Sequence, residues 1–156
     1  MSNLRQNMNG LTTLDIIAFQ LGEQTFCIET TSVREIRGWA SSTPLPHASP
    51  EVLGIINLRG TVIPTIDLSR KLGMRSGETT ERSAIVVVEV SGMPLGLVVV
   101  QVTDMLSVTS DQLQPAPSVA SSFDRSWCAG IITHISGMIC FLDLQAMFAS
   151  SDALAA

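Results

Sequence analysis

One pattern occurs twice in this chain and constrains its fold more than any other feature. The runs GIINLRGTVIPTIDL at residues 54–68 and GIITHISGMICFLDL at residues 130–144 begin with Gly-Ile-Ile and end with Asp-Leu at the same spacing. In each run a glycine, Gly60 or Gly137, separates two apolar stretches. Such self-similarity predicts that the chain is built from two related units.

A second pair of segments aligns without gaps ahead of these runs. Phe26, Ile28, Val33, Glu35 and Ile36 fall opposite Leu95, Leu97, Val102, Asp104 and Met105. Chance apolar runs seldom keep acidic positions in register. The chain therefore has the order A-B-A′-B′, which indicates two halves of one β-rich plan.

Residues 54–66 predict a β-hairpin. Two runs rich in β-branched residues flank a turn at Arg59-Gly60, where Gly60 supplies the backbone freedom that a tight turn needs. Pro64 has no N–H to donate, so we expect the second strand to lie at a sheet edge or to carry a bulge. Asp67 follows the hairpin and is a suitable N-cap for a short helix.

The remaining segments favour the same class of structure. Residues 83–90 and 95–100 are nearly continuous apolar runs, which indicates burial on both faces or in a barrel interior. With the hairpins they predict about nine or ten short strands and very little helix. The expected fold class is all-β, built from small barrels.

Length and composition set the domain organisation. The 156 residues are 46% hydrophobic and 15% charged, enough for one packed domain or for two small subdomains that share an interface. We expect this unit over residues 14–149. Residues 1–13 are polar and without periodicity, which predicts a flexible arm, and residues 150–156 are expected to form a tail.

Charge and hydropathy exclude two classes of partner. The net charge is −5 and the chain has no cluster of Lys and Arg, so we expect no nucleic-acid binding. The apolar runs are far shorter than the ~20 residues of a membrane helix, so we expect no direct membrane insertion. The N-terminus has no apolar stretch typical of a secretion signal, which predicts a cytoplasmic protein.

The cysteines and histidines give little support for an enzyme. Cys27, Cys128 and Cys140 are odd in number and form no Cys-x-x-Cys, so we expect reduced thiols and neither a disulfide framework nor a zinc site. Cys27 or Cys128 with His47 or His134 remains conceivable as a nucleophile pair. No nucleotide-binding glycine motif occurs. We therefore expect no catalytic, cofactor-binding or metal-binding residues.

Arg59 is a polar residue whose position has no obvious explanation in packing. It lies beside Gly60 at the tip of an apolar hairpin. It is either a solvated turn residue or an anchor that pairs with a carboxylate or a peptide carbonyl at an interface. Glu35 is the candidate carboxylate, because the repeat gives Asp104 as its counterpart. Periodicity favours a core position for the apolar neighbours of these acids. A groove where the two halves meet remains the alternative.

These motifs resemble the CheW family, the coupling adaptors of bacterial chemotaxis. The resemblance spans about residues 14–148, and the turn NLRG followed by VIPTIDL is its most specific part. It is carried by FCIETTSVREIRG, GIINLRGTVIPTIDLSRKLG, LGLVVVQVTDMLSV, SDQLQPAP and GIITHISGMICFLDL. The resemblance implies two packed five-stranded SH3-like β-barrels with a few short helices.

The resemblance also implies a function. Family members are non-enzymatic scaffolds that link the cytoplasmic tips of methyl-accepting chemoreceptors to the regulatory domain of the histidine kinase CheA, in receptor arrays at the membrane. By position, Arg59 corresponds to the family's signature arginine and Glu35 to its acidic neighbour. The other positions carried over are Val33, Ile36, Val102 and Met105 for contact with receptor or kinase, and Gly54 and Gly96 as small-residue positions.

Two other functions follow from the residues alone and remain as alternatives. The first is a cysteine-dependent enzyme, which needs an activated thiol. The second is a β-barrel that binds a small apolar ligand, which needs space inside the barrel.

Overall fold

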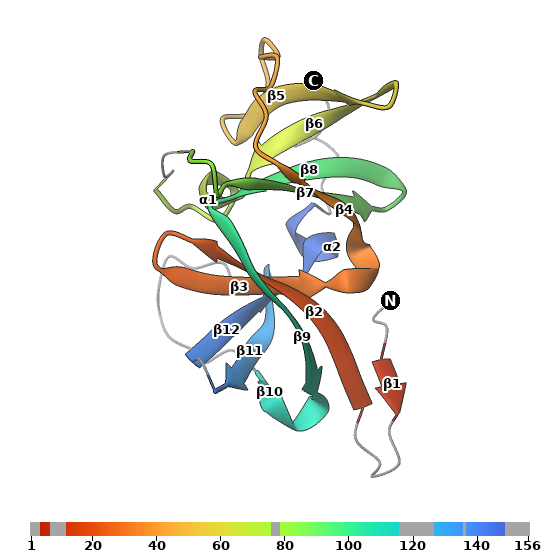
Figure 1. Cartoon of the computed structure of the whole chain (residues 1–156), viewed down its shortest axis with the longest axis vertical. Coiled ribbons are helices and arrows are strands. Elements are labelled where there is room, and N and C mark those ends of the chain that lie inside the picture. Colours follow the sequence, from red (N-terminus) through yellow and green to blue (C-terminus); the bar gives the residue numbers. More distant parts are fainter. Residues whose placement is uncertain (1–3, 7–11, 76–78, 116–126, 136, 149–156) are drawn as a thin grey trace.

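A computed structural model of the chain describes residues 4–6, 12–75, 79–115, 127–135 and 137–148 (Figure 1). The first half contains β1 (Leu4–Gln6), β2 (Thr12–Leu21), β3 (Gln24–Glu29), η1 (Thr30–Ser32), β4 (Val33–Gly38), β5 (Val52–Leu58), β6 (Thr61–Asp67) and α1 (Leu68–Lys71). The second half contains β7 (Ala84–Val90), β8 (Met93–Val99), β9 (Gln101–Thr109), η2 (Ser110–Gln112), β10 (Leu113–Gln114), β11 (Cys128–His134), β12 (Gly137–Leu142) and α2 (Leu144–Met147).

The strands form two sheets, and each half of the chain contributes to both. One sheet has the order β4-β7-β8-β6-β5. The other has the order β1-β2-β3-β12-β11-β10, with β9 paired to β2. In Figure 1 the first sheet lies above the second. The prediction of an all-β fold in two subdomains with few short helices is confirmed, and the second sheet adds the short strands β1 and β10 to the five that were expected.

The pairing register confirms the sequence repeat. β6 and β8 run parallel with Thr65 opposite Gly96, and β12 and β3 run parallel with Phe141 opposite Cys27. The repeat makes Thr65 equivalent to Phe141 and Gly96 equivalent to Cys27. The two parallel pairs are therefore the same contact made twice, each time between the two halves.

The irregular features also repeat. A register shift falls between Val52 and Gly54 in β5 and again between Cys128 and Gly130 in β11. A further register shift lies between Val33 and Glu35 in β4. The β2·β9 ladder shifts between Val102 and Asp104, which are the equivalent positions in the second half. β-Bulges re-aim strands and fix register, so both halves bend their strands at equivalent residues.

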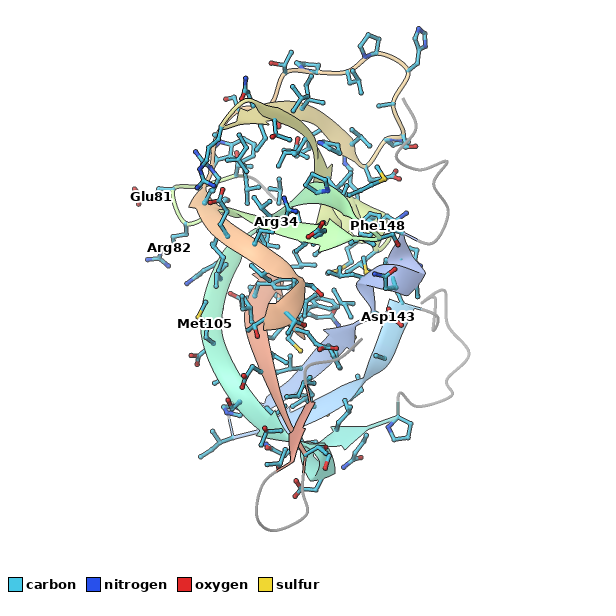
Figure 2. All side chains as sticks on the ribbon, turned by 90° about the vertical axis from the view of Figure 1, so that its right-hand side faces the viewer. Arg34, Glu81, Arg82, Met105, Asp143 and Phe148 are labelled. Atoms are coloured by element: carbon cyan, nitrogen blue, oxygen red, sulfur yellow. The ribbon has the colours of Figure 1, made fainter. Side chains whose placement is uncertain are left out.

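Both short helices start in the same way. The carboxylate of Asp67 accepts a hydrogen bond from the backbone N–H of Arg70, and that of Asp143 accepts one from Ala146. A capping acid satisfies one of the free N–H groups of a first helical turn. Figure 2 shows Asp143 and Phe148 flanking α2.

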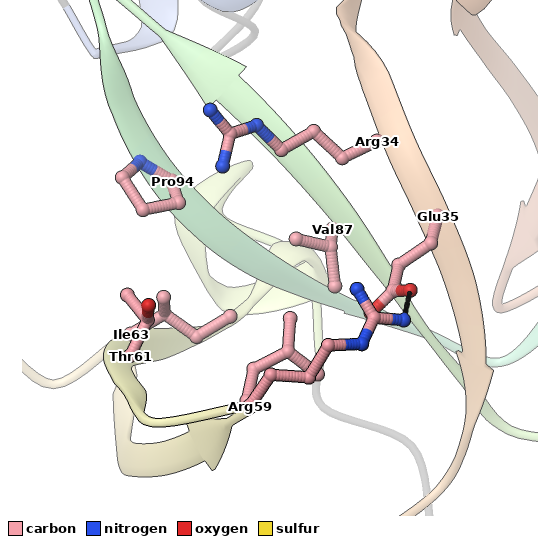
Figure 3. Close-up of a pocket in the computed structure, with 8 residues that line it drawn as sticks. Arg34, Glu35, Arg59, Thr61, Ile63, Val87 and Pro94 are labelled. Atoms are coloured by element: carbon pink, nitrogen blue, oxygen red, sulfur yellow. Dashed lines mark hydrogen bonds and ion pairs between the residues drawn. The ribbon is translucent and has the colours of Figure 1, made fainter.

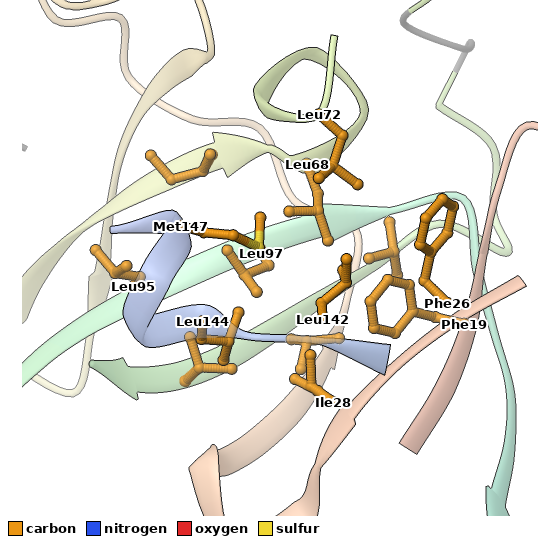
Figure 4. Close-up of a cluster of buried hydrophobic side chains, with 14 of the residues drawn as sticks. Phe19, Phe26, Ile28, Leu68, Leu72, Leu95, Leu97, Leu142, Leu144 and Met147 are labelled. Carbon is orange, nitrogen blue, oxygen red and sulfur yellow. The ribbon is translucent and has the colours of Figure 1, made fainter. Parts of the chain in front are cut away.

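Hydrophobic burial joins the two sheets through a central cluster, shown in Figure 4. Its members come from both halves and include Phe19, Phe26, Leu68, Leu95, Leu97, Leu142, Leu144 and Met147. Each sheet also has a smaller hydrophobic cluster of its own. One is built around Ile16, Val108 and Ile132, and the other around Ile63, Ile85 and Val87.

Strand β7 explains the nearly continuous apolar run. Val86, Val88 and Val90 belong to the central cluster, while the alternate residues Ile85 and Val87 belong to the cluster of their own sheet. Because successive side chains of a strand point to opposite faces, a strand that separates two cores is apolar at nearly every position.

Pro64 does not place its strand at a sheet edge. β6 lies between β5 and β8, so the edge position is wrong, and the register shift of this hairpin lies in β5, between Val52 and Gly54, and not in β6. The physical requirement is still met, because β8 pairs only with Thr65, Ile66 and Asp67, beyond the proline. The missing N–H at Pro64 therefore falls outside the parallel ladder.

Part of the expected N-terminal arm is paired. β1 runs antiparallel to β2, with Leu4 opposite Leu14, and Thr12 and Thr13 belong to β2 itself. β3 pairs with β2 only from Ile16 onward, so the start of β2 offers an open edge that β1 occupies. The rest of the arm, and the tail at residues 150–156, lie outside the described residues.

Neither α1 nor α2, nor any other helix in the described part of the chain, is long and apolar enough to cross a bilayer.

We predict that Gly54→Ala lowers the free energy of unfolding by roughly 3 kcal/mol. A Cβ at residue 54 would lie 2.2 Å from the backbone oxygen of Thr43, which pairs with Ile55 over the glycine. The repeat gives Gly130 the same restriction, with the oxygen of Gln114 at 2.7 Å. Urea denaturation measures the effect. The control is Gly38→Ala, whose Cβ would meet no described atom within 4 Å. Equal stability of the Gly38 and Gly54 variants would contradict the account.

Candidate partner-binding site

Arg59 projects from the turn of the β5–β6 hairpin. Arg59 and Gly60 are the two central turn residues, with φ of +52° and +87°. Two positive φ values are typical of the tight hairpin turn whose twist matches that of the strands, and glycine adopts them without strain. The Asn57 side chain supports the turn by accepting a hydrogen bond from the Gly60 N–H at 2.9 Å. The hairpin therefore holds Arg59 at a fixed point beyond the sheet.

Glu35 is the ion-pair partner of Arg59. It lies on β4, opposite Val87 of β7, just after the bulge. The Nη2 of Arg59 donates to the Oε2 of Glu35 at 2.6 Å, and the Nη1 of Arg37 lies 3.6 Å from the other carboxylate oxygen. The Glu35 side chain is 21% exposed and that of Arg59 75% exposed. The acid is thus the anchored partner, and the arginine extends into solvent above it.

A hollow of about 240 Å³ opens beside this pair (Figure 3). Arg59 and Glu35 stand at one side, and Arg34 lies on the other side next to Pro94. The hollow is lined by Arg34, Glu35, Leu58, Arg59, Thr61, Ile63, Val87 and Pro94. Its aliphatic side chains and its two guanidinium groups suit a protein side chain with an apolar body and a polar end.

Arg34 has its own carboxylate partner. Its guanidinium lies 3.2 Å from one oxygen of Glu89 and 3.0 Å from the other, a two-point contact between β4 and β7. Sequence reasoning missed Arg34, Arg37 and Glu89. The charges were visible in the sequence, but their pairing depends on the β4·β7 ladder, which joins segments from different halves.

The four apolar candidates fall into two groups. Val33 and Val102 are partly buried and pack against the central cluster. Ile36 is 37% exposed and Met105 is 64% exposed, and Figure 2 shows Met105 pointing outward from β9. The structure places Ile36 and Met105 on different sheets, at positions related by the repeat.

The second half lacks the arginine–glutamate pair. Asp104 stands at the position equivalent to Glu35, and its carboxylate accepts a hydrogen bond from the Met105 N–H at 3.0 Å. The position equivalent to Arg59 is Ile135, which is 99% exposed. The two related surfaces therefore differ in chemistry, since the equivalents of the paired Arg59 and Glu35 are an exposed aliphatic side chain, Ile135, and an acid, Asp104.

The three glycines singled out in the sequence have distinct geometries. Gly60 has space around it, and the positive φ at this position is what favours glycine. Gly54 lies under the backbone of Thr43. Gly96 lies inside its sheet, where a Cβ would approach the Cγ2 of Ile85 to 2.9 Å and the Cγ2 of Thr65 to 3.4 Å.

Cys27 and Cys140 show little activation for nucleophilic chemistry. Burial, with smaller contributions from the other two cysteines, raises the pKa of Cys27 well above its usual range. Burial and then the neighbouring Cys128 raise the pKa of Cys140 to about 12. A cysteine nucleophile acts as a thiolate, which needs a lowered pKa. Within the described ranges no three His, Cys, Asp or Glu side chains gather in a way that could hold a metal ion.

Comparison with protein families and relatives gives one consistent result. Residues 15–152 match the family model of the CheW-like domain. The chain is 45% identical over 142 residues to a chemotaxis protein CheW of Rhizobium meliloti (strain 1021), covering 91% of this chain and 92% of the relative. It is 43% identical, over the same shares, to a probable chemotaxis protein CheW of Rhizobium etli.

A solved structure supports the same comparison. The crystal structure of the scaffolding protein TtCheW from Thermoanaerobacter tengcongensis superposes with a TM-score of 0.81 at 29% sequence identity. The match covers 89% of this chain and 94% of that protein.

We predict that the Arg59–Glu35 pair contributes only about 0.5 kcal/mol to folding, because exposed ion pairs are screened by solvent. A double-mutant cycle with Arg59→Ala and Glu35→Ala, read by urea denaturation, measures this coupling, which should shrink in high salt. The Arg34–Glu89 pair serves as the control and should give a similar value. A coupling above ~2 kcal/mol would show that the pair exists chiefly for stability.

The apolar candidates should separate by stability. We predict that Val33→Ala and Val102→Ala each lower the free energy of unfolding by roughly 1–2 kcal/mol, because both side chains pack against the central cluster. Ile36→Ala and Met105→Ala should change it by less than ~0.5 kcal/mol. Thermal and urea denaturation of the four variants measure this, and equal losses at all four positions would contradict the division.

Proposed function

This chain belongs to the CheW family of chemotaxis proteins, and we propose that it couples methyl-accepting chemoreceptors to the histidine kinase CheA by binding both at once. The observation that carries the proposal is the match over nearly the whole chain to a chemotaxis CheW protein, together with the structural match to a scaffolding protein. The partners in the proposal are the regulatory domain of CheA and the cytoplasmic tip of the receptors, with the protein located in receptor arrays at the membrane.

The work of such an adaptor is done by binding energy. Holding kinase and receptor on one scaffold raises the effective concentration of each near the other and fixes their orientation. This role needs two surfaces that bind different partners, and specificity between partners requires that the surfaces differ. The pseudo-symmetric fold supports the proposal, since one surface carries Arg59 and Glu35 while the equivalent surface carries Ile135 and Asp104.

Six residues are proposed for partner contact, with different parts to play. Arg59 is the exposed anchor and Glu35 fixes its position through the 2.6 Å hydrogen bond. Ile36 and Met105 offer exposed apolar side chains. Val33 and Val102 support β4 and β9 from within, since they pack against the central cluster.

The two alternative functions have less support. A cysteine-dependent enzyme is disfavoured by the raised pKa values of Cys27 and Cys140. A ligand-binding barrel is disfavoured by the fully buried side chains that fill each sheet, such as Ile16 in one and Ile85 in the other. We therefore propose a non-enzymatic scaffold.

Binding to the isolated partners tests the proposal. Titration calorimetry with the regulatory domain of CheA and with a receptor-tip fragment should give saturable binding in the micromolar range for each. Binding should survive replacement of all three cysteines, because no thiol chemistry is involved. Absence of binding to either partner would overturn the coupling function and leave the fold unaffected.

We predict that Arg59→Ala lowers receptor-dependent kinase activity about tenfold, the loss of one anchor at an interface. Its melting temperature should change little, since the Arg59 side chain is largely exposed. Phosphorylation assays with receptor membranes and CheA measure the coupling. Arg75→Ala is the charge-matched control, because Arg75 is exposed and does not line the hollow. A loss of stability that accounts for the whole loss of coupling would contradict a contact role.

A further inference from the structure

Two thiols face each other across the β11–β12 hairpin. The Sγ atoms of Cys128 and Cys140 lie 3.3 Å apart, and both residues are partly exposed and unbridged. The register places Cys128 opposite Leu142, and Cys140 lies two residues earlier on β12. Because residues two apart on a strand point to the same face, both thiols lie on the face that carries Leu142.

The third cysteine is turned away from this pair. Cys27 belongs to the cluster inside the larger sheet, whereas Cys140 packs against the central cluster on the opposite face of β12. In the β3·β12 ladder it is Phe26 that lies opposite Cys140, and Cys27 lies opposite Phe141. Only Cys128 therefore offers Cys140 a same-face thiol partner.

We propose that Cys128 and Cys140 form a dithiol site that oxidises reversibly to an intramolecular disulfide between β11 and β12. The sulfur atoms of a disulfide are separated by about 2.05 Å, so they must approach by roughly 1.3 Å from the 3.3 Å contact. Side-chain rotation can supply an approach of this size. The bulge between Cys128 and Gly130 carries Cys128 along the hairpin toward Cys140.

The oxidant in this proposal is hydrogen peroxide. The Cys128 sulfur attacks one oxygen of the peroxide and the O–O bond breaks. The Cys128 thiol proton leaves with the departing hydroxyl group as one water, and a sulfenic acid remains on Cys128. The Cys140 sulfur then attacks the Cys128 sulfur, the S–O bond breaks, and the thiol proton of Cys140 leaves with the hydroxyl group as a second water. Two thiols are oxidised and one peroxide is reduced to two waters.

The surroundings assign the order of these steps. Cys140 donates its S–H to the sulfur of Cys128, and Cys128 in turn donates to the backbone oxygen of Gly130 at 3.3 Å. Burial and the contact with Cys128 raise the pKa of Cys140 to about 12, so Cys140 retains its proton. The sulfur of Cys128 accepts the S–H of Cys140, and an accepted hydrogen bond stabilises developing negative charge on a sulfur, so we assign Cys128 as the thiol that reacts first and Cys140 as the one that resolves the sulfenic acid.

The disulfide would lie close to the point where β12 leads into α2. β12 ends at Leu142, Asp143 caps α2, and the N–H of Asp143 donates to the oxygen of Trp127, the residue before Cys128. The bond would therefore join the two strands beside a hydrogen bond that already ties them. Glu35 and Arg59 lie on the other sheet, so this site is separate from the proposed partner anchor.

Mapping the oxidised thiols tests the proposal. The full chain is reduced, treated with hydrogen peroxide, denatured and alkylated, and then cleaved with cyanogen bromide, which cuts after Met138 between the two cysteines. We expect two of the three thiols to be lost to alkylation, a Cys128–Cys140 cross-linked fragment, and full recovery of three thiols after dithiothreitol.

Single variants complete the test. Cys27→Ala should retain the cross-link. Cys128→Ala should abolish it and leave Cys27 and Cys140 alkylatable, whereas Cys140→Ala should abolish it and leave a sulfenic acid on Cys128 in place of an alkylatable thiol. Three alkylatable thiols in the peroxide-treated wild-type chain would overturn the proposal. So would a bond to Cys27 or one between two chains.

Discussion

Burial of the central cluster is the interaction on which the rest of the structure depends. Phe19 and Phe26 from the first half meet Leu95 and Leu97 from the second, and residues of α1 and α2 close the cluster. Fully burying such a side chain contributes about 1.5–3 kcal/mol, so the joint between the halves is a main source of stability. Each sheet also takes strands from both halves of the chain, so neither half can complete a sheet without the other half. The two subdomains are one folding unit.

The repeat in the sequence predicted more of this fold than any single segment. The matched positions of Gly54 and Gly130, and of Asp67 and Asp143, are enough to expect two related halves, because turns, caps and apolar spacing are local properties. Strand exchange is not local, because β4 pairs with β7 of the other half rather than within its own half. The same limit applies to the site. The Arg59–Glu35 pair could be suggested from the repeat, whereas the contacts of Arg34 and Arg37 needed the folded β4.

The two halves share a backbone but differ in their surface side chains, and this difference bears on function. The backbone repeats down to its bulges and helix caps, which positions two outer surfaces in equivalent ways. The side chains at these surfaces do not repeat, since Ile135 stands where Arg59 would be. A duplicated frame with different side chains is a simple way for one small protein to bind two different partners.

Simultaneous binding is the central claim, and a ternary titration tests it most directly. A receptor-tip fragment is titrated calorimetrically into a preformed complex of this chain with the regulatory domain of CheA. Simultaneous binding predicts that the fragment binds with an affinity within about threefold of that for the free chain, and that the kinase domain stays bound. Displacement of the kinase domain by the fragment would show that the two partners compete for one surface, and would contradict the account.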